Sequence, residues 1–110
     1  MDLDLEGLMR TFFGECEESL HAMEQALLAL EARPEDPEQV QILFRMAHSL
    51  KGNAMSLGFT DLAEFTHGLE EVLDRLRSRE TAVTAETVSL LLASVDALRE
   101  MLPAAGADAR

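Results

Sequence analysis

Apolar residues recur every three or four positions along almost the whole chain, which is the spacing of helices that each bury one face. No stretch alternates apolar and polar residues over the length of a half-buried strand. Glycine and proline fall between the periodic stretches, where they indicate helix ends. The pattern predicts helices at residues 3–32, 37–57, 61–79 and 85–102. Four such helices with short connections are typical of an all-α, antiparallel up-and-down four-helix bundle.

Capping signals support the ends of the middle helices. Asp36 is a favourable N-cap, Pro37 suits the first helical position and Gln39 stands where a capping box needs it. Gly58 predicts the end of the second helix. Thr60 predicts the cap of the third.

The chain's last helix is predicted to follow Thr84 and to end at Pro103. The 110 residues suffice for one hydrophobic core but not for two. Residues 1–103 are therefore predicted to form one domain. Residues 104–110 are expected to be a disordered tail or the start of a linker.

Composition excludes several kinds of partner. Nine Lys and Arg stand against 21 Asp and Glu, a formal net charge of −12, so no basic patch can form for nucleic acid or an anionic membrane. The first residues do not resemble a signal peptide, and no apolar run approaches a membrane span. Cys16 is the only cysteine, which fits a buried core residue in a reducing compartment. The sequence predicts a cytoplasmic domain.

The apolar stripes predict which side chains form the core. They are Leu5, Met9, Phe12, Cys16, Leu20, Met23, Leu27 and Leu30 in the first helix, Val40, Leu43, Ala47, Leu50, Ala54 and Leu57 in the second, and Leu62, Phe65, Leu69, Val72, Leu73 and Leu76 in the third.

One turn of the second helix carries an unusual set of residues. His48 falls on the solvent side of that helix, and Lys51 lies at the flank of its apolar stripe. Gly52 follows His48 by one turn, although a glycine inside a helix costs about 1 kcal/mol relative to alanine. It leaves space beside an exposed imidazole, as a partner protein or a phosphate would need. Phe44 and Met55 border the same surface.

His67 and Glu70 are neighbours on the third helix, predicted to lie on the side away from its apolar stripe. If the second and third helices are adjacent, one of these side chains could reach His48. A carboxylate that accepts the proton of one ring nitrogen fixes the tautomer and leaves the other nitrogen as a nucleophile.

The main alternative to a reactive histidine is a four-helix bundle that binds metal ions. Di-iron proteins use two Glu-x-x-His pairs that project into the bundle core, and this chain has Glu18 with His21 and Glu64 with His67. Both pairs lie away from the apolar stripes, and the second helix has no glutamate on its stripe. The sequence therefore predicts no metal site.

Three segments together resemble a known family. They are "FFGECEESL", "HSLKGNAMSLGF" and "THGLEEVLDRLR". They are similar to the histidine-phosphotransfer (Hpt) domain, and specifically to the N-terminal P1 domain of CheA-type chemotaxis histidine kinases. Asn53 departs from the pattern, because many CheA-type members have a second glycine there.

The resemblance implies that His48 accepts a phosphoryl group from ATP, delivered by a separate kinase domain, and passes it to an aspartate of a CheY-like response regulator. It implies that Glu70 orients and activates the imidazole, that Lys51 helps to hold the phosphoryl oxygens, and that His67 completes the hydrogen-bond network. Gly52 would let the partner approach.

The same resemblance assigns ATP and Mg²⁺ to the kinase domain, and Mg²⁺ also to the regulator, with no cofactor bound by this domain. The chain has no nucleotide-binding motif, so the isolated domain is expected to be a phosphoryl carrier and not an enzyme. It is expected to be part of a larger kinase, and residues 104–110 would then begin the linker to the rest of that kinase. Phe44 and Met55 would contribute apolar docking contacts, and a monomer is expected. The alternative is a bundle that docks a regulator or kinase without being phosphorylated.

Overall fold

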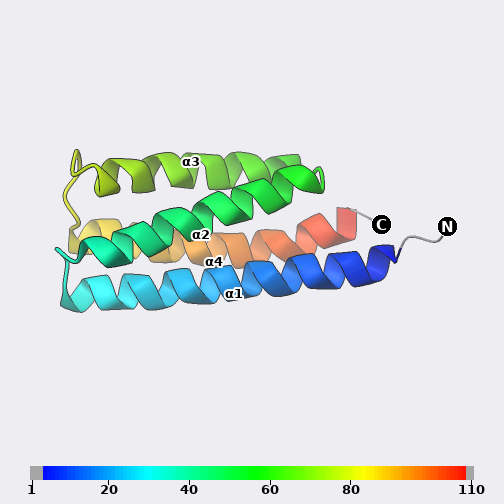
Figure 1. The fold of residues 1–110 in the computed structure, drawn as a ribbon, viewed down its shortest axis with the longest axis horizontal. Helices are drawn as coiled ribbons and strands as arrows, with labels where there is room; N and C mark the ends of the chain where they lie inside the picture. Colours follow the sequence, from blue (N-terminus) through cyan, green and yellow to red (C-terminus); the bar gives the residue numbers. More distant parts are fainter. Residues whose placement is uncertain (1–3, 109–110) are drawn as a thin grey trace.

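The computed structural model describes residues 4–108, with side chains through Leu102. These residues form four α-helices, α1 (Leu5–Ala32), α2 (Pro37–Ser56), α3 (Thr60–Arg77) and α4 (Ala85–Asp108), and no strand. Successive helices run in opposite directions (Figure 1). The predicted all-α, antiparallel four-helix bundle is confirmed. None of the described helices is both long and apolar enough to cross a bilayer.

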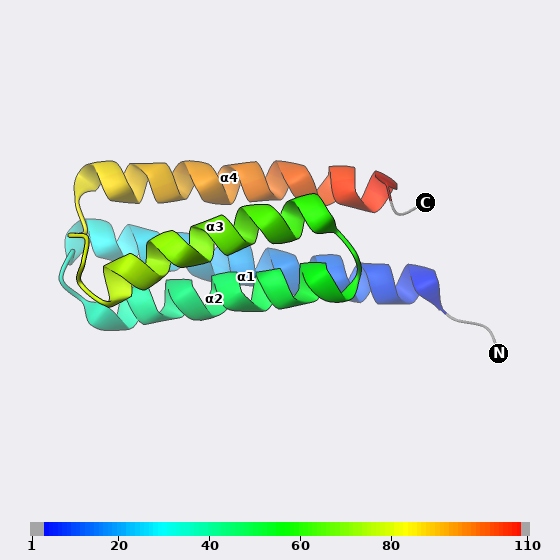
Figure 2. The same ribbon diagram turned by 90° about the horizontal axis from the view of Figure 1, so that it is seen from above.

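The helices form a closed ring of neighbours. α1 packs against α2 and α4, and α3 packs against the same two helices from the opposite corner (Figure 2). The α2–α3 pair has the most extensive contact, whereas α3 and α4 touch least. Side chains on α2 and α3 are therefore the ones that meet across a well-packed helix pair.

Two of the predicted caps are present and one is wrong. The Glu38 backbone N–H donates to Asp36 Oδ1 over 3.0 Å, and the Thr87 N–H donates to Thr84 Oγ1 over 3.1 Å. α3, however, has Phe59 as its N-cap, with Thr60 as the first helical residue. The Phe59 ring packs against Phe12 with ring centroids 5.2 Å apart, and this contact fixes the entry of the chain into α3 one residue earlier.

The prediction that Pro103 ends the last helix is also wrong, because α4 continues to Asp108. Proline has a φ compatible with a helix and removes only one backbone hydrogen bond. Three of the five residues after it are alanine, the strongest helix former. Residues 104–108 of the predicted tail therefore belong to α4, and residues 109–110 lie outside the described part of the chain.

The core lies along the bundle axis and is almost entirely aliphatic. It contains Phe12, Cys16, Leu20, Met23, Leu27 and Leu30 of α1, Val40, Leu43, Ala47, Leu50 and Ala54 of α2, Leu62, Leu69, Leu73 and Leu76 of α3, and Val88, Leu91, Val95, Leu98 and Leu102 of α4.

Five residues of the predicted stripes are not in this core, because Met9 and Leu57 are half-buried and Leu5, Phe65 and Val72 are exposed. Leu5 is exposed because the first turn of α1 projects past the neighbouring helices (Figure 1). Phe65 and Val72 are each 37% exposed, whereas Thr66 is fully buried and donates to the Leu62 carbonyl over 2.8 Å. α3 is rotated so that its α2-facing side is covered, which turns Phe65 and Val72 outward.

Candidate functional site

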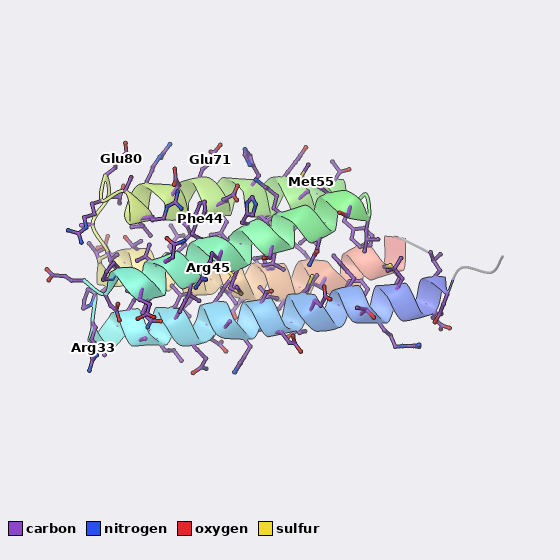
Figure 3. All side chains as sticks on the ribbon, in the orientation of Figure 1. Arg33, Phe44, Arg45, Met55, Glu71 and Glu80 are labelled. Atoms are coloured by element: carbon purple, nitrogen blue, oxygen red, sulfur yellow. The ribbon has the colours of Figure 1, made fainter. Side chains whose placement is uncertain are left out.

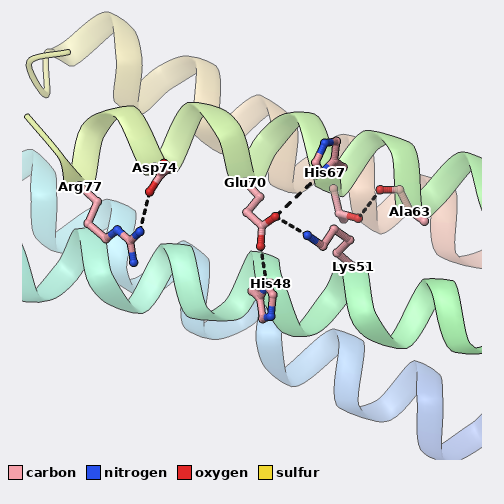
Figure 4. Close-up of polar contacts among 8 residues, drawn as sticks. His48, Lys51, Ala63, His67, Glu70, Asp74 and Arg77 are labelled. Atoms are coloured by element: carbon pink, nitrogen blue, oxygen red, sulfur yellow. Dashed lines mark hydrogen bonds and ion pairs between the residues drawn. The ribbon is translucent and has the colours of Figure 1, made fainter. Parts of the chain in front are cut away.

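A polar cluster bridges α2 and α3 at the turn that the sequence singled out (Figure 4). His48 Nδ1 lies 2.5 Å from Glu70 Oε2, and Lys51 Nζ donates to Glu70 Oε1 over 2.5 Å. Both carboxylate oxygens of Glu70 are therefore engaged by side chains of α2. The structure brings His48, Lys51 and Glu70 together, so of the two residues that the sequence offered, Glu70 and not His67 reaches His48.

The short connection between the two helices explains this meeting. α2 ends at Ser56 and α3 begins at Thr60, with Gly58 between them at φ 76°. Because the helices run antiparallel from this turn, residues at similar distances on either side of it face each other. His48 precedes Gly58 by about as many residues as Glu70 follows it.

Glu70 is buried, which corrects the prediction that it lies away from the packed side of α3. Its side chain is only 11% exposed. Burial raises the pKa of Glu70, but hydrogen bonds from Lys51 and from His48 lower it by more, so the pKa lies below its ordinary value. At neutral pH the group facing His48 is therefore an ionised carboxylate.

His48 is held at one nitrogen and accessible at the rest of its ring. With the Nδ1 proton donated to Glu70, a neutral imidazole keeps a lone pair on Nε2. The His48 side chain is 65% exposed, so another protein can reach this lone pair. The arrangement can therefore present a nucleophilic nitrogen of fixed tautomer to solvent.

The surface on one side of His48 is open. A Cβ added at Gly52 would meet no atom within 4 Å. Gly52 and His48 border a shallow hollow between α1 and α2, which Glu15 and Glu18 also line. The glycine thus keeps the surface beside the imidazole low, as its position predicted.

His67 lies at the edge of the cluster and contacts a different carboxylate. Its Nε2 is 3.1 Å from Glu71 Oε1, whereas its Nδ1 is 3.9 Å from Glu70 Oε1. The second distance is within ion-pair range but too long for a hydrogen bond. Glu71 is thus the carboxylate nearer to His67, at ion-pair distance.

The predicted partner surface follows the exposed side of α2, along which Figure 3 labels Phe44, Arg45 and Met55. Phe44 is half-buried, and its ring lies nearly parallel to the His48 imidazole, with centroids 6.4 Å apart. Met55 is 64% exposed. These side chains therefore extend the surface around His48 in both directions along the helix.

Sequence reasoning missed Arg77. Its Cζ lies 3.9 Å from the centroid of the Phe44 ring, and its Nη2 donates to Asp74 Oδ1 over 2.6 Å. Two spacings could have indicated it, because Arg77 follows Glu70 by two helical turns and Phe44 precedes His48 by one.

The four residues of the rejected metal site are all exposed. Glu18 and His21 lie on α1, whereas Glu64 and His67 lie on α3, and α1 and α3 are not neighbours in the bundle. Among the side chains that the structure describes, no three His, Cys, Asp or Glu residues are placed to bind one metal ion.

Known proteins are similar to this chain in sequence and in fold. The family model described as "Hpt domain" matches residues 7–104. The chain is 41% identical over 104 residues to the chemotaxis protein CheA of Klebsiella aerogenes, covering 94% of this chain and 16% of that protein. It is 38% identical over 100 residues to CheA of Bacillus subtilis, covering 91% and 15%. The chain thus spans about a sixth of the length of these curated relatives.

Solved structures of CheA domains have the same fold as this chain. The CheA phosphotransferase domain from Thermotoga maritima superimposes with a TM-score of 0.86 at 34% identity, covering 92% of this chain and 96% of that one. The phosphorylated P1 domain of CheA3, in a crystal structure with CheY6 from R. sphaeroides, gives a TM-score of 0.87 at 31% identity, covering 94% and 81%. Sequence and fold agree over nearly the whole chain, and the chain therefore belongs to the Hpt domain family.

Proposed function

We propose that this domain is a phosphoryl carrier of a chemotaxis signalling pathway and that His48 carries the phosphoryl group. The observation that supports this most is the pairing of an exposed imidazole, at Nδ1, with the buried carboxylate of Glu70. The similarity to CheA proteins, and to a P1 domain that is phosphorylated in a complex with CheY6, supports the choice of pathway.

In the proposed first step, His48 Nε2 attacks the γ-phosphorus of an ATP–Mg²⁺ complex held by a separate kinase domain. An N–P bond forms as the bond to the bridging oxygen breaks, and ADP leaves with that electron pair. Glu70 keeps the Nδ1 proton in a hydrogen bond and offsets the positive charge that the ring acquires. Positioning and charge compensation carry most of phosphoryl-transfer catalysis.

In the second step, a carboxylate oxygen of an aspartate on a CheY-like response regulator attacks the phosphorus. The N–P bond breaks and its electron pair returns to Nε2, so His48 is ready for another cycle. Phe44, Gly52 and Met55 form the docking surface that brings the regulator to His48 in this proposal.

The other site residues have supporting parts. The resemblance implies that Lys51 holds phosphoryl oxygens. In the unphosphorylated domain Lys51 donates to Glu70, so there we assign to it the task of keeping this carboxylate ionised and in place. We assign His67, whose Nδ1 lies 3.9 Å from Glu70 Oε1, to the edge of the polar network around Glu70.

We infer that the domain binds no cofactor of its own. ATP and Mg²⁺ belong to the kinase domain, and Mg²⁺ also to the regulator. The isolated domain is then a substrate and donor, not an enzyme, and the parent chain is an ATP-dependent histidine kinase. We place both the domain and its parent chain in the cytoplasm, and we expect the isolated domain to be a monomer.

Phosphorylation with a CheA-type kinase core and ATP–Mg²⁺, followed by intact-mass measurement and peptide mapping, tests this function. We expect one acid-labile phosphate on His48, absent in His48→Gln and present in His21→Gln, which changes an exposed histidine on α1. A kinase core that phosphorylates a CheA relative but leaves this folded domain unmodified would contradict the proposal. Regulator binding that survives in His48→Gln would then favour the docking-only module.

A further inference from the structure

Two contacts hold Arg77 against Phe44, which precedes the proposed phosphoacceptor His48 by one helical turn. Its guanidinium lies on the Phe44 ring, 3.9 Å from Cζ to the ring centroid, and donates to Asp74 over 2.6 Å. The Phe44 ring is in turn nearly parallel to the His48 imidazole, at an angle of 12°. Figure 4 shows the Arg77 side chain reaching from α3 across to α2. One aromatic ring therefore has both the guanidinium and the imidazole as neighbours.

A phosphoryl group on His48 would find the lysine of the polar cluster already engaged. It adds a charge of about −1.5 to −2 at neutral pH. Lys51 is already bound to Glu70, which contacts Nδ1 and not the nitrogen that would carry the phosphate. The hollow on the other side of His48 is lined by Glu15 and Glu18. The new charge thus meets acidic neighbours on a domain whose net charge is already −12.

The present contacts of Arg77 are of a kind that a phosphate can displace. Arg77 and Asp74 form an exposed pair three residues apart on one helix, with side chains 41% and 53% exposed. Exposed ion pairs and exposed cation–π contacts are both weak. A guanidinium can instead donate two parallel hydrogen bonds to one phosphoryl group, which is a stronger and more specific interaction.

We propose that Arg77 is a phosphate-binding residue of the phosphorylated domain, which leaves the Phe44 ring and Asp74 and pairs with the phosphoryl group on His48. This inference rests on the proposed function, because it requires that His48 is phosphorylated. Arg45 is the competing cation, exposed three residues before His48 on α2. Arg77 is favoured because its guanidinium already contacts Phe44, the ring that is stacked with the His48 imidazole.

The test measures the equilibrium constant for phosphorylation of His48 at a fixed ATP-to-ADP ratio, with a CheA-type kinase core. Arg77→Gln is expected to lower the constant about fivefold, because a charge-assisted hydrogen bond to the product is lost. The loss should shrink at high salt. Arg75→Gln is the matched control, since Arg75 is exposed on the same helix but faces another direction, and it should leave the constant unchanged.

A second measurement follows the guanidinium itself in the wild-type protein. NMR of the Arg77 Nε–H group should show it leaving the shielding region of the Phe44 ring when His48 is phosphorylated. An unchanged resonance, or an unchanged equilibrium constant in Arg77→Gln, would overturn the inference while leaving the carrier function intact. A loss seen in Arg45→Gln in place of Arg77→Gln would overturn it too. Absence of phosphate on the wild type would overturn both proposals.

Discussion

The orientation of the His48 imidazole is set by a residue on another helix. An exposed histidine ordinarily exchanges between tautomers and rotamers, and neither nitrogen is reserved for chemistry. Here a buried carboxylate, Glu70, occupies Nδ1, and Lys51 on α2 favours the ionised form of that carboxylate. The buried, ionised carboxylate of Glu70 on α3 is thus the group that orients the His48 side chain on α2.

Glu70→Gln is expected to slow phosphorylation of His48 roughly 100-fold, a typical contribution of one positioned acid–base group. The amide has nearly the same size but cannot stabilise the charge on the ring or on Lys51. The initial rate with a kinase core and ATP–Mg²⁺ measures the effect. Glu64→Gln, an exposed glutamate on the same helix, serves as the control. A wild-type rate in a folded Glu70→Gln protein would show that the hydrogen bond is not used.

Spacing alone singled out His48, Lys51 and Gly52, because they make an unusual turn in an otherwise regular amphipathic helix, whereas their proposed roles came from the family resemblance. It misplaced Glu70, because the predicted stripe on α3 was centred on all its large apolar residues. The structure centres the buried face nearer to α2, so Glu70 is covered and Val72 is not. Such a rotation depends on how tightly each neighbour packs, which one helix's sequence does not contain.

Two helices end with the same hydrogen-bond pattern but with different residues at the left-handed position. After α2, the N–H groups of Gly58 and Phe59 donate to the carbonyls of Met55 and Ala54. After α3, Arg79 and its successor Glu80 repeat this Schellman motif, with acceptors on Leu76 and Arg75. The left-handed residue is glycine in the first motif, at φ 76°, and arginine in the second, at φ 65°.

Replacement of Arg79 by glycine is expected to stabilise the domain by about 0.5 kcal/mol, because removal of the strain at positive φ exceeds the added entropy of the unfolded chain. Gly58→Ala should destabilise it by about 1 kcal/mol for the opposite reason. Thermal and urea unfolding monitored by circular dichroism measures both changes. Equal stabilities of Arg79→Gly and wild type would show that Arg79 is not strained in this turn.

The four helices and their order were predictable, because each has a periodic stripe bounded by glycine, proline or a capping residue. The errors concern ends at which tertiary contacts or a permissive proline override the local signal. Phe59, held by Phe12, displaced Thr60 from the cap position. Pro103 did not stop α4, because the residues after it favour a helix strongly enough to continue it.

Across the whole bundle, charged side chains connect helices away from the site, whereas apolar side chains are exposed near it. Arg99 on α4 donates to Glu24 on α1, lowering the pKa of Glu24 through this hydrogen bond, and so connects the two helices away from the site. Around His48, by contrast, the described surface combines acidic side chains with exposed apolar ones such as Met55. A regulator whose phosphate-accepting pocket is also acidic gains little from charge at this surface, so apolar contact must supply most of its affinity.

Met55→Ala and Phe44→Ala are therefore each expected to weaken binding of a CheY-like regulator about tenfold, since each removes apolar area from the proposed docking surface on one side of His48. Leu90→Ala is the matched control, because Leu90 is 63% exposed on α4, as Met55 is 64% exposed on α2. Titration calorimetry at two salt concentrations measures affinity and its charge dependence. Affinity that does not fall at higher salt would agree with apolar docking. Unchanged affinity in both α2 variants would instead place the regulator on another face of the bundle.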